Sequence, residues 1–227
     1  MRNNLKEVIL AINHESCWTS LVGDYVVKTM YLTINPEKNF IRSIILLDKK
    51  YKNLISEIKK TKSFVGYNHL SISEEGKILF DFRKRYKNSV LNTLQSNEGI
   101  VVKGLKYKGR EIWQILIYES YLNQFINELK SKGEIEILGS KDYEIKEDEL
   151  SPQEVQILGS AYKQGYFDFP RKIKSDEISK KLDMSKSTFS YHIRSIESKI
   201  ITKYLDDLKF LNTLNYIDKN TKKKEEK

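Results

Sequence analysis

The sequence of 227 residues is poor in several features that mark particular classes of protein. It contains one cysteine, which excludes an internal disulfide framework and a metal cage built of cysteines alone, and which favours a reducing compartment. No apolar run approaches the roughly 20 residues that a bilayer span requires. The apolar stretch near the N-terminus is too short for a signal peptide. We therefore expect a cytoplasmic protein without a membrane segment.

The sequence also lacks the spacing patterns of common enzyme sites. It contains no GxSxG, Walker, HExxH, GxGxxG or CxxC motif, so neither a catalytic constellation nor a cofactor is predicted. Two histidines and the cysteine, His14, His69 and Cys17, match no strong metal-binding spacing, and no metal site is predicted. The expectation is a protein that is not an enzyme.

Charge is abundant and its balance is basic. The 40 Lys and Arg residues outnumber the 31 Asp and Glu residues and give a net charge of +9. Residues 1–150 carry 24 basic and 20 acidic residues, whereas residues 151–227 carry 16 and 11, a larger excess in half the length. A basic balance favours a polyanionic partner, although it is equally compatible with simple solubility.

The first 140 residues alternate between strand-like apolar runs and helix-like apolar stripes. A short helix is expected after residue 16, and helical stripes with spacings of three and four lie near Tyr51, Val90 and Leu122. Seven apolar runs are typical of buried strands. They are residues 7–12, 26–34, 40–47, 63–72, 77–82, 100–107 and 111–118.

In chain order these elements give the pattern βαββαβ twice, with an offset of about 70 residues between matching positions. The predicted fold class is therefore α+β, with a tandem of two ferredoxin-like units over residues 1–140 that serves as a sensor or assembly domain. An all-α domain follows this tandem.

The boundary between the two parts lies in a polar, acidic stretch, which is predicted as a linker over residues 141–150. Ser151 and Pro152 then suit the N-cap and the first position of a helix. Residues 151–217 are predicted to form the all-α domain with a C-terminal helix. Residues 218–227 carry almost no apolar side chain and are predicted to be a disordered tail.

Two helices of the all-α part have helix-turn-helix spacing. The first of them starts after Ser175, and the second follows a turn at 183–185 and places Phe189, Ile193 and Ile196 on one face. Short hydroxyl side chains near a helix start can approach phosphates, and an arginine further along can reach base edges. The outward face holds Lys186, Ser187, Ser190, Tyr191 and Arg194.

Three blocks of unusual residues at fixed spacing give residues 150–201 a specific resemblance. They are Leu-Ser-x-x-Glu at 150–154, Ala-Tyr-x-x-Gly-Tyr-Phe-x-x-Pro-Arg at 161–171 and Ser-Lys-Ser-Thr-x-Ser-x-His-x-Arg at 185–194. The segment resembles the C-terminal helix-turn-helix of the archaeal bacterio-opsin activator (Bat-like) family. The resemblance covers just under a quarter of the chain and implies an archaeal transcription regulator with a variable N-terminal sensor. Tyr191 departs from the family pattern, in which Glu or Arg is common there.

Together the helix pattern and the resemblance predict a sequence-specific DNA-binding regulator. The predicted contacts in the helix-turn-helix are Ser185, Lys186, Ser187, Thr188, Ser190, Tyr191, His192 and Arg194. Arg171 and Lys172 either clamp the DNA backbone or lie in a solvated loop. The alternative function is RNA binding by the ferredoxin-like sheets, but their strands lack the required Gly-aromatic-x-aromatic pattern.

A stripe of apolar residues at spacings near three runs from Tyr204 to Ile217. It indicates either packing within the domain or pairing across a dimer, and a homodimer on double-stranded DNA is the predicted assembly.

The N-terminal part has one junction with candidate effector-binding residues, the stretch NHESCWTS at 13–20. It follows the first strand, where backbone N–H groups of a coming helix are free to bind a ligand, and it resembles a segment of some Bat-like proteins. The predicted residues are His14, Cys17, Trp18 and Thr19. A small anion, a metal ion and an oxidant are the alternative effectors, and the competing interpretation is that Cys17 and Trp18 only cover the edge of the core.

Overall fold

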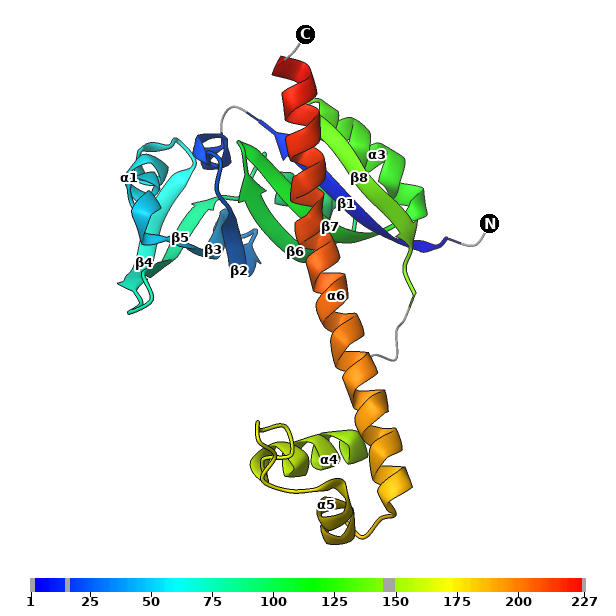
Figure 1. The fold of residues 1–227 in the computed structure, drawn as a ribbon. Coiled ribbons are helices and arrows are strands. Elements are labelled where there is room, and N and C mark those ends of the chain that lie inside the picture. Colours follow the sequence, from blue (N-terminus) through cyan, green and yellow to red (C-terminus); the bar gives the residue numbers. More distant parts are fainter. Residues whose placement is uncertain (1–2, 15–16, 145–149, 226–227) are drawn as a thin grey trace. The chain divides into compact units, whose positions relative to one another are not determined.

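The computed structural model describes residues 3–14, 17–144 and 150–225, and the chain divides into two compact units. The N-terminal unit comprises Met1–Tyr143 and the C-terminal unit Glu144–Lys227. The first is built on one eight-stranded antiparallel sheet and the second is helical (Figure 1). Among the described helices, none combines the length and the apolar character needed to cross a bilayer.

In the described part of the N-terminal unit, all seven apolar runs form strands, and the last strand supplies the eighth that the repeated βαββαβ pattern requires. Its strands are β1 (Leu5–Asn13), β2 (Val27–Asn35), β3 (Phe40–Asp48), β4 (Phe64–Ile72), β5 (Lys77–Arg85), β6 (Ile100–Tyr107), β7 (Arg110–Tyr118) and β8 (Glu134–Asp142). Its helices are η1 (Trp18–Leu21), η2 (Lys49–Tyr51), α1 (Asn53–Lys60), α2 (Val90–Ser96) and α3 (Glu119–Lys130). The additional strand, β8, lies at the edge of the sheet and has a short apolar stretch among polar residues, so it shows no long apolar run.

The strand order differs from that of two independent ferredoxin-like units. The order is β4-β5-β3-β2-β6-β7-β1-β8. In two independent βαββαβ units, β1 would lie between β3 and β4, and β5 would lie between β7 and β8. In the structure β5 lies between β4 and β3, while β1 lies between β7 and β8. The predicted tandem therefore needs correction, because its two halves have exchanged their first strands.

The two half-sheets pair directly over only a short stretch of strand. We call β4-β5-β3-β2 the first half-sheet and β6-β7-β1-β8 the second half-sheet. Direct pairing between them is limited to Val27 with Lys106 and Lys28 with Leu105, at the start of β2. By contrast, β5 pairs with β3 from Phe40–Arg85 to Asp48–Lys77. The halves are also joined by the chain, which crosses between them after β1 and after β5, and by the core of the second half-sheet, which includes Ile41 of β3.

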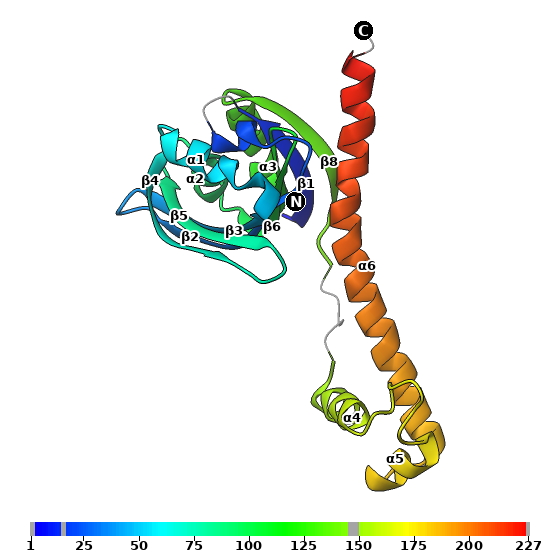
Figure 2. The ribbon, with the colours of Figure 1, turned by 60° about the vertical axis from the view of Figure 1, so that its left-hand side comes forward.

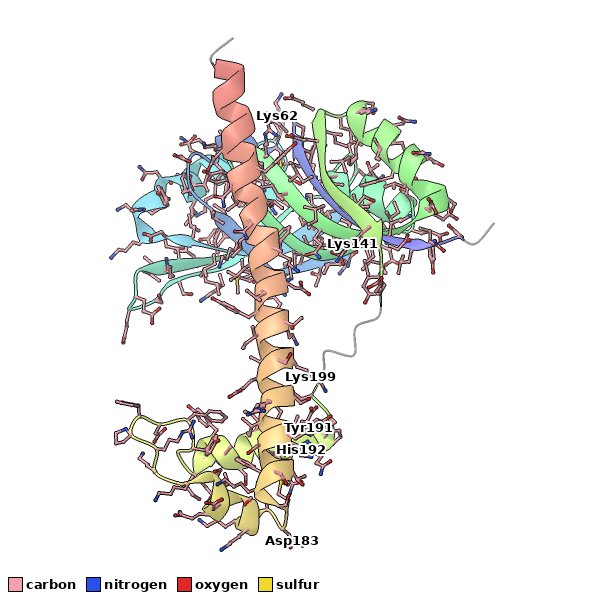
Figure 3. The ribbon with its side chains drawn as sticks, turned by 45° about the vertical axis from the view of Figure 1, so that its right-hand side comes forward. Lys62, Lys141, Asp183, Tyr191, His192 and Lys199 are labelled. Carbon is pink, nitrogen blue, oxygen red and sulfur yellow. The ribbon has the colours of Figure 1, made fainter. Side chains whose placement is uncertain are left out.

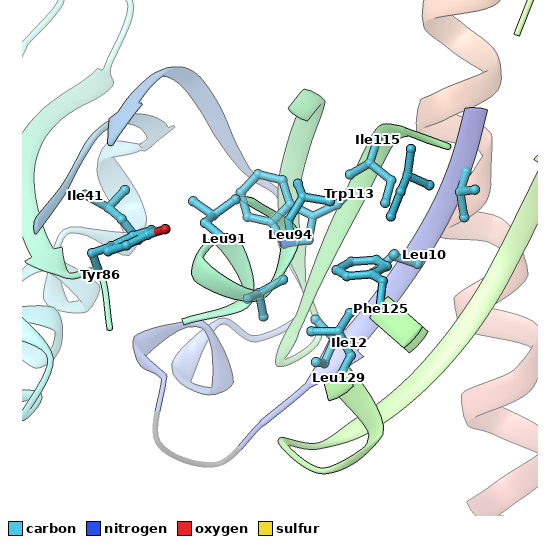
Figure 4. Packing of buried hydrophobic residues seen from close by; sticks show 13 residues of the cluster. Leu10, Ile12, Ile41, Tyr86, Leu91, Leu94, Trp113, Ile115, Phe125 and Leu129 are labelled. Carbon is cyan, nitrogen blue, oxygen red and sulfur yellow. The ribbon is translucent and has the colours of Figure 1, made fainter. Parts of the chain in front are cut away.

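The helices cover one face of this sheet, which curves around them (Figure 2). The core of the first half-sheet contains residues of η1 and α1, and that of the second contains residues of α2 and α3. Figure 4 shows the second core, in which Leu10 of the exchanged strand β1 packs with Trp113 and Phe125. Each exchanged strand is thus followed by a helix that packs on the other half, and the chain crosses between the halves after β1 and again after β5.

The C-terminal unit contains three helices, α4 (Pro152–Lys163), α5 (Ser175–Lys181) and α6 (Lys186–Glu225). Gly165 ends α4 in the left-handed region at φ 72°, and the N–H groups of Gly165 and Tyr166 donate to the carbonyls of Tyr162 and Ala161. This is the Schellman arrangement, in which glycine avoids the cost of a side chain at positive φ.

Two predicted boundaries differ from the structure. The predicted linker at 141–150 begins within β8, which ends at Asp142, and residues 145–149 lie outside the described residues. The predicted disordered tail at 218–227 is helical to Glu225, and residues 226–227 lie outside the described residues. Neither glycine nor proline interrupts the sequence after Lys186, and lysine and glutamate are good helix formers, so the helix propagates through the charged end.

Replacing Gly104 with alanine should destabilise the second half-sheet. A Cβ atom at this position would overlap the indole ring of Trp113, which is buried in the core. We expect Gly104→Ala to lower the free energy of unfolding by about 1–3 kcal/mol in urea denaturation, as for other overpacked sites. The matched control is Gly139→Ala in β8, where an added Cβ meets no atom within 4 Å. Equal stabilities for the two variants would contradict the described packing of Trp113.

Candidate functional site

The helix-turn-helix is held together by an apolar core that fixes which face of α6 is exposed. Phe189, Ile193 and Ile196 of α6 are buried with Ile157 of α4 and Ile178 of α5. This is the inward face that the sequence predicted. Because a helix turns 100° per residue, the intervening positions of the first three turns point away from the core.

A buried carboxylate fixes α6 against the start of α4. Glu154 accepts hydrogen bonds from the backbone N–H of Ser151, the hydroxyl of Ser195 and the ammonium of Lys199, at 2.8, 2.9 and 2.8 Å. The Ser151 hydroxyl in turn accepts from the Glu154 N–H and completes a capping box. The hydrogen bond from Lys199, followed by those from Ser151 and Ser195, lowers the pKa of Glu154 to about 2.

The turn between α5 and α6 sets the start of the exposed helix. Asp183 adopts φ 52° in this turn, a left-handed conformation in which Asp is one of the tolerated residues (Figure 3). Ser185 then caps α6, because its hydroxyl accepts a hydrogen bond from the Thr188 N–H at 3.1 Å. The Ser185 hydroxyl also lies 2.7 Å from that of Ser187. Hydroxyl groups and free backbone N–H groups thus gather at one helix end.

The predicted contact residues of α6 share one accessible face. Ser185, Lys186, Ser187, Thr188, Tyr191 and Arg194 are exposed, and Ser190 and His192 are half-buried. Tyr191 is 71% exposed and its ring meets that of His192 edge-on, with the centroids 5.7 Å apart (Figure 3). The Lys186 ammonium lies 2.9 Å from the carboxylate of Asp176 in α5.

The two predicted residues before α5 are exposed and both make contacts within the unit. The guanidinium of Arg171 lies 4.6 Å from the centroid of the Tyr166 ring, a cation–π contact. The ammonium of Lys172 lies 2.7 Å from the carboxylate of Asp168. Both cations therefore have fixed positions beside the helix-turn-helix.

Comparison with known proteins identifies this unit. Residues 150–202 match the family described as "HTH DNA binding domain". A stretch of 62 residues is 34% identical to the protein named Transcriptional regulator NarO from Haloferax volcanii. Residues 150–202 are a Bat-like helix-turn-helix domain. The stretch similar to NarO covers 27% of this chain and 29% of that relative, so the match spans less than a third of either protein.

Outside the Bat-like domain, three of the four predicted effector residues, His14, Cys17 and Thr19, lie around a buried carboxylate that the sequence did not reveal. Glu111 of β7 is 1% exposed. Its Oε1 accepts hydrogen bonds from the Cys17 thiol at 3.0 Å and the Thr19 hydroxyl at 3.3 Å, and its Oε2 accepts from the Trp113 indole N–H at 2.9 Å. The His14 Nε2 lies 3.5 Å from the same Oε1.

Two buried lysines lie beside this carboxylate. The Lys84 ammonium of β5 is 3.7 Å from Glu111 Oε1. The Lys106 ammonium of β6 donates to the Thr29 hydroxyl at 2.7 Å and lies 4.0 Å from the centroid of the Trp113 ring. Both lysines are at least 94% buried, which is rare for this residue type unless it is paired.

The ionisation of the cluster follows from burial and from the nearby charges. Burial favours the neutral form of Glu111, but Lys84, His14 and Lys106 hold its pKa well below the usual range. Burial also opposes the charged form of Lys84, but Glu111 and Cys17 outweigh it and raise the pKa. Burial similarly opposes protonation of His14, yet Cys17 and Glu111 raise its pKa to about 10. For Lys106 burial dominates and lowers the pKa to about 8.

The structure therefore brings His14, Cys17 and Thr19 together and separates Trp18 from them. The Trp18 ring is 1% exposed and meets the Phe82 ring edge-on in the first core, with the centroids 5.7 Å apart. The other two residues of the stretch, 15 and 16, lie outside the described residues. Glu111 was detectable in principle, because it shares the inward face of its strand with Trp113 and two isoleucines.

Acid should weaken the Bat-like domain through Glu154. Since its folded-state pKa lies below the ordinary value of 4.5, its contribution to stability is present above about pH 4.5 and is lost as the pH falls toward 2. We expect the melting temperature to fall between pH 4.5 and 2, and to fall less in Glu154→Gln, which is already destabilised at pH 7. The control is Glu197→Gln, an exposed acid on α6. Parallel acid profiles for Glu154→Gln and the wild type would contradict the assignment.

Proposed function

We propose that the protein is a sequence-specific regulator of transcription that inserts the first three turns of α6 into the major groove of double-stranded DNA. The observation that carries this proposal is the exposed face of hydroxyl and cationic side chains on α6, within a domain of a DNA-binding family. A helix of about 10 Å diameter fits a major groove about 12 Å wide.

The two ends of this face have different roles in the proposal. At the start of α6, the free N–H groups and the hydroxyls of Ser187 and Thr188 meet phosphate oxygens, and Ser185 keeps its capping bond. One and two turns further along, Tyr191 and Arg194 reach base edges. Arginine pairs with guanine by two hydrogen bonds, the commonest specific contact between proteins and DNA.

Three cations supply the contacts that do not depend on sequence. Lys186 exchanges its exposed ion pair with Asp176 for a phosphate, a change that costs little because exposed ion pairs contribute at most about 1 kcal/mol. Arg171 and Lys172 contact the backbone of the same DNA from the loop before α5. His192, which is half-buried beside Tyr191, supports the position of that ring.

We further propose that the protein acts as a homodimer and that the N-terminal unit is its sensor. A single helix-turn-helix reads few bases, and dimers gain affinity by spanning two half-sites one helical turn apart. The helix α6 continues well beyond the Bat-like domain, and its residues Tyr204 and Leu205 are exposed apolar side chains suited to pairing between copies. A buried charged cluster in the N-terminal unit suits a role in sensing.

Arg194→Ala should weaken binding to a specific duplex by about 1–3 kcal/mol and relax the preference at one base position. Lys186→Ala should weaken binding to all duplexes alike and reduce the slope of log affinity against log salt by about one. Fluorescence anisotropy over a series of salt concentrations measures both effects. The control is Lys163→Ala, which removes an exposed charge from α4. If both α6 variants behaved as this control does, α6 would not be the DNA-contacting helix.

A competition experiment distinguishes DNA binding by α6 from RNA binding by the sheet. Unlabelled single-stranded RNA should leave the complex with duplex DNA intact in a gel shift, whereas unlabelled duplex DNA of the same sequence should displace it. Displacement by RNA at lower concentration than by DNA would favour the alternative function.

Light scattering at micromolar concentration should give the mass of a dimer. Truncation after Lys203 removes the apolar stripe of α6 from Tyr204 onward and should yield a monomer if this stripe forms the dimer surface. A truncated chain that stays dimeric would place the surface in the N-terminal unit. A full-length chain that is monomeric would contradict the proposed assembly.

A further inference from the structure

A pocket of about 210 Å³ opens beside the buried cluster, at the place where the chain crosses between the half-sheets. Its floor includes His14, Lys84 and Glu111, and its rim includes the exposed residues Lys62 and Lys87. Lys62 is labelled in Figure 3. The pocket is small compared with the roughly 300–1,000 Å³ typical of sites for drug-sized ligands, so its ligand would have few atoms.

The described lining of this pocket is strongly positive. Five of the residues that line it are of basic type, while Glu111 is the acidic residue among the described lining residues. The cations are His14, Lys62, Lys84, Arg85 and Lys87. Lys106, which is buried and acts electrostatically on Glu111, adds a further positive charge. One carboxylate thus faces several cations in a region where water screens poorly.

The floor is built of buried groups with limited partners. Lys84 is 6% exposed and lines the pocket, and the carboxylate oxygen nearest to its ammonium among the described residues lies 3.7 Å away, beyond hydrogen-bond length. Within the described residues, the buried His14 Nε2 makes no hydrogen bond of good geometry. An anion in the pocket would supply acceptors for these two donors. It would also offset the uncompensated positive charge.

We propose that this pocket binds a small anion with at least two negative charges, of the phosphate or carboxylate class. We also propose that this anion is the effector of the regulator, a step that rests on the sensor function proposed above. The lysines at the rim suit either class, since an ammonium pairs with phosphate and carboxylate alike.

A metal ion is the competing occupant, because ligand atoms of His14, Cys17 and Glu111 lie within 4.8 Å of one another. The positive charges around the pocket disfavour a metal ion. The Lys84 ammonium lies beside the same Glu111 oxygen that a metal would require. A divalent cation would add positive charge to a site that already has an excess of it.

The position of the pocket links ligand binding to the strand exchange. His14 and Cys17 lie between β1 and η1, and Lys87 and Ser89 lie between β5 and α2, which are the two crossings between the half-sheets. A ligand seated here contacts both crossings at once. Binding therefore stabilises the two crossings between the half-sheets in the conformation that the structure shows.

The test is direct binding of inorganic phosphate and of citrate to the full chain, by calorimetry and thermal shift, against sodium chloride of matched ionic strength. We expect saturable binding of at least one of the two anions. The variant Lys62→Ala/Lys87→Ala should weaken it by about tenfold. Both residues are exposed, so this variant should fold. The charge-matched control is Lys52→Ala/Lys130→Ala, exposed lysines outside the pocket, which should bind as the wild type does.

Three outcomes would overturn the anion site. They are no saturable binding of either anion, equal loss of binding in the rim variant and its control, and stoichiometric binding of zinc that the anions do not reduce. DNA affinity with and without the anion is measured separately. If the anion binds through the rim lysines and DNA affinity is unchanged, the site stands and the proposed sensor function fails.

Discussion

The buried carboxylate of Glu111 is the interaction on which the N-terminal unit depends. It accepts hydrogen bonds from Cys17, Thr19 and Trp113, and it lies 3.7 Å from the ammonium of Lys84. These groups come from both half-sheets and from the crossing between them. A buried carboxylate without such partners would cost several kcal/mol, so the arrangement around Glu111 can form only when the exchanged strands are both in place.

The C-terminal unit likewise contains a buried carboxylate, Glu154, that accepts several hydrogen bonds. Glu154 joins the cap of α4 to Ser195 and Lys199 of α6, while the apolar core beneath fixes the rotation of α6 about its axis. The cap, the carboxylate and the core together leave one polar face of α6 exposed. That face can be offered to a groove without rearrangement of the domain, which is how a rigid scaffold supports specific recognition.

The sequence predicted the local structure well and the long-range pairing poorly. Helix spacing and the motif at 185–194 predicted the helix-turn-helix, because each depends on residues close in the chain. The strand exchange was not predictable from the pattern. The inward residues of β1 and β5, such as Leu10 and Phe80, are equally apolar, so either strand suits either central position. Lys84 and Lys106 were missed for the same reason, since their burial results from contacts distant in sequence.

The central claim is that the protein reads DNA sequence through α6, and selection from a random pool of duplexes by the full chain tests it most directly. If α6 reads the major groove as proposed, the selected duplexes share a motif arranged as an inverted repeat, with half-site centres about 10 base pairs apart, and selection is lost when the major-groove edges of the motif are chemically modified. A pool that stays random after repeated rounds at physiological salt would contradict the account.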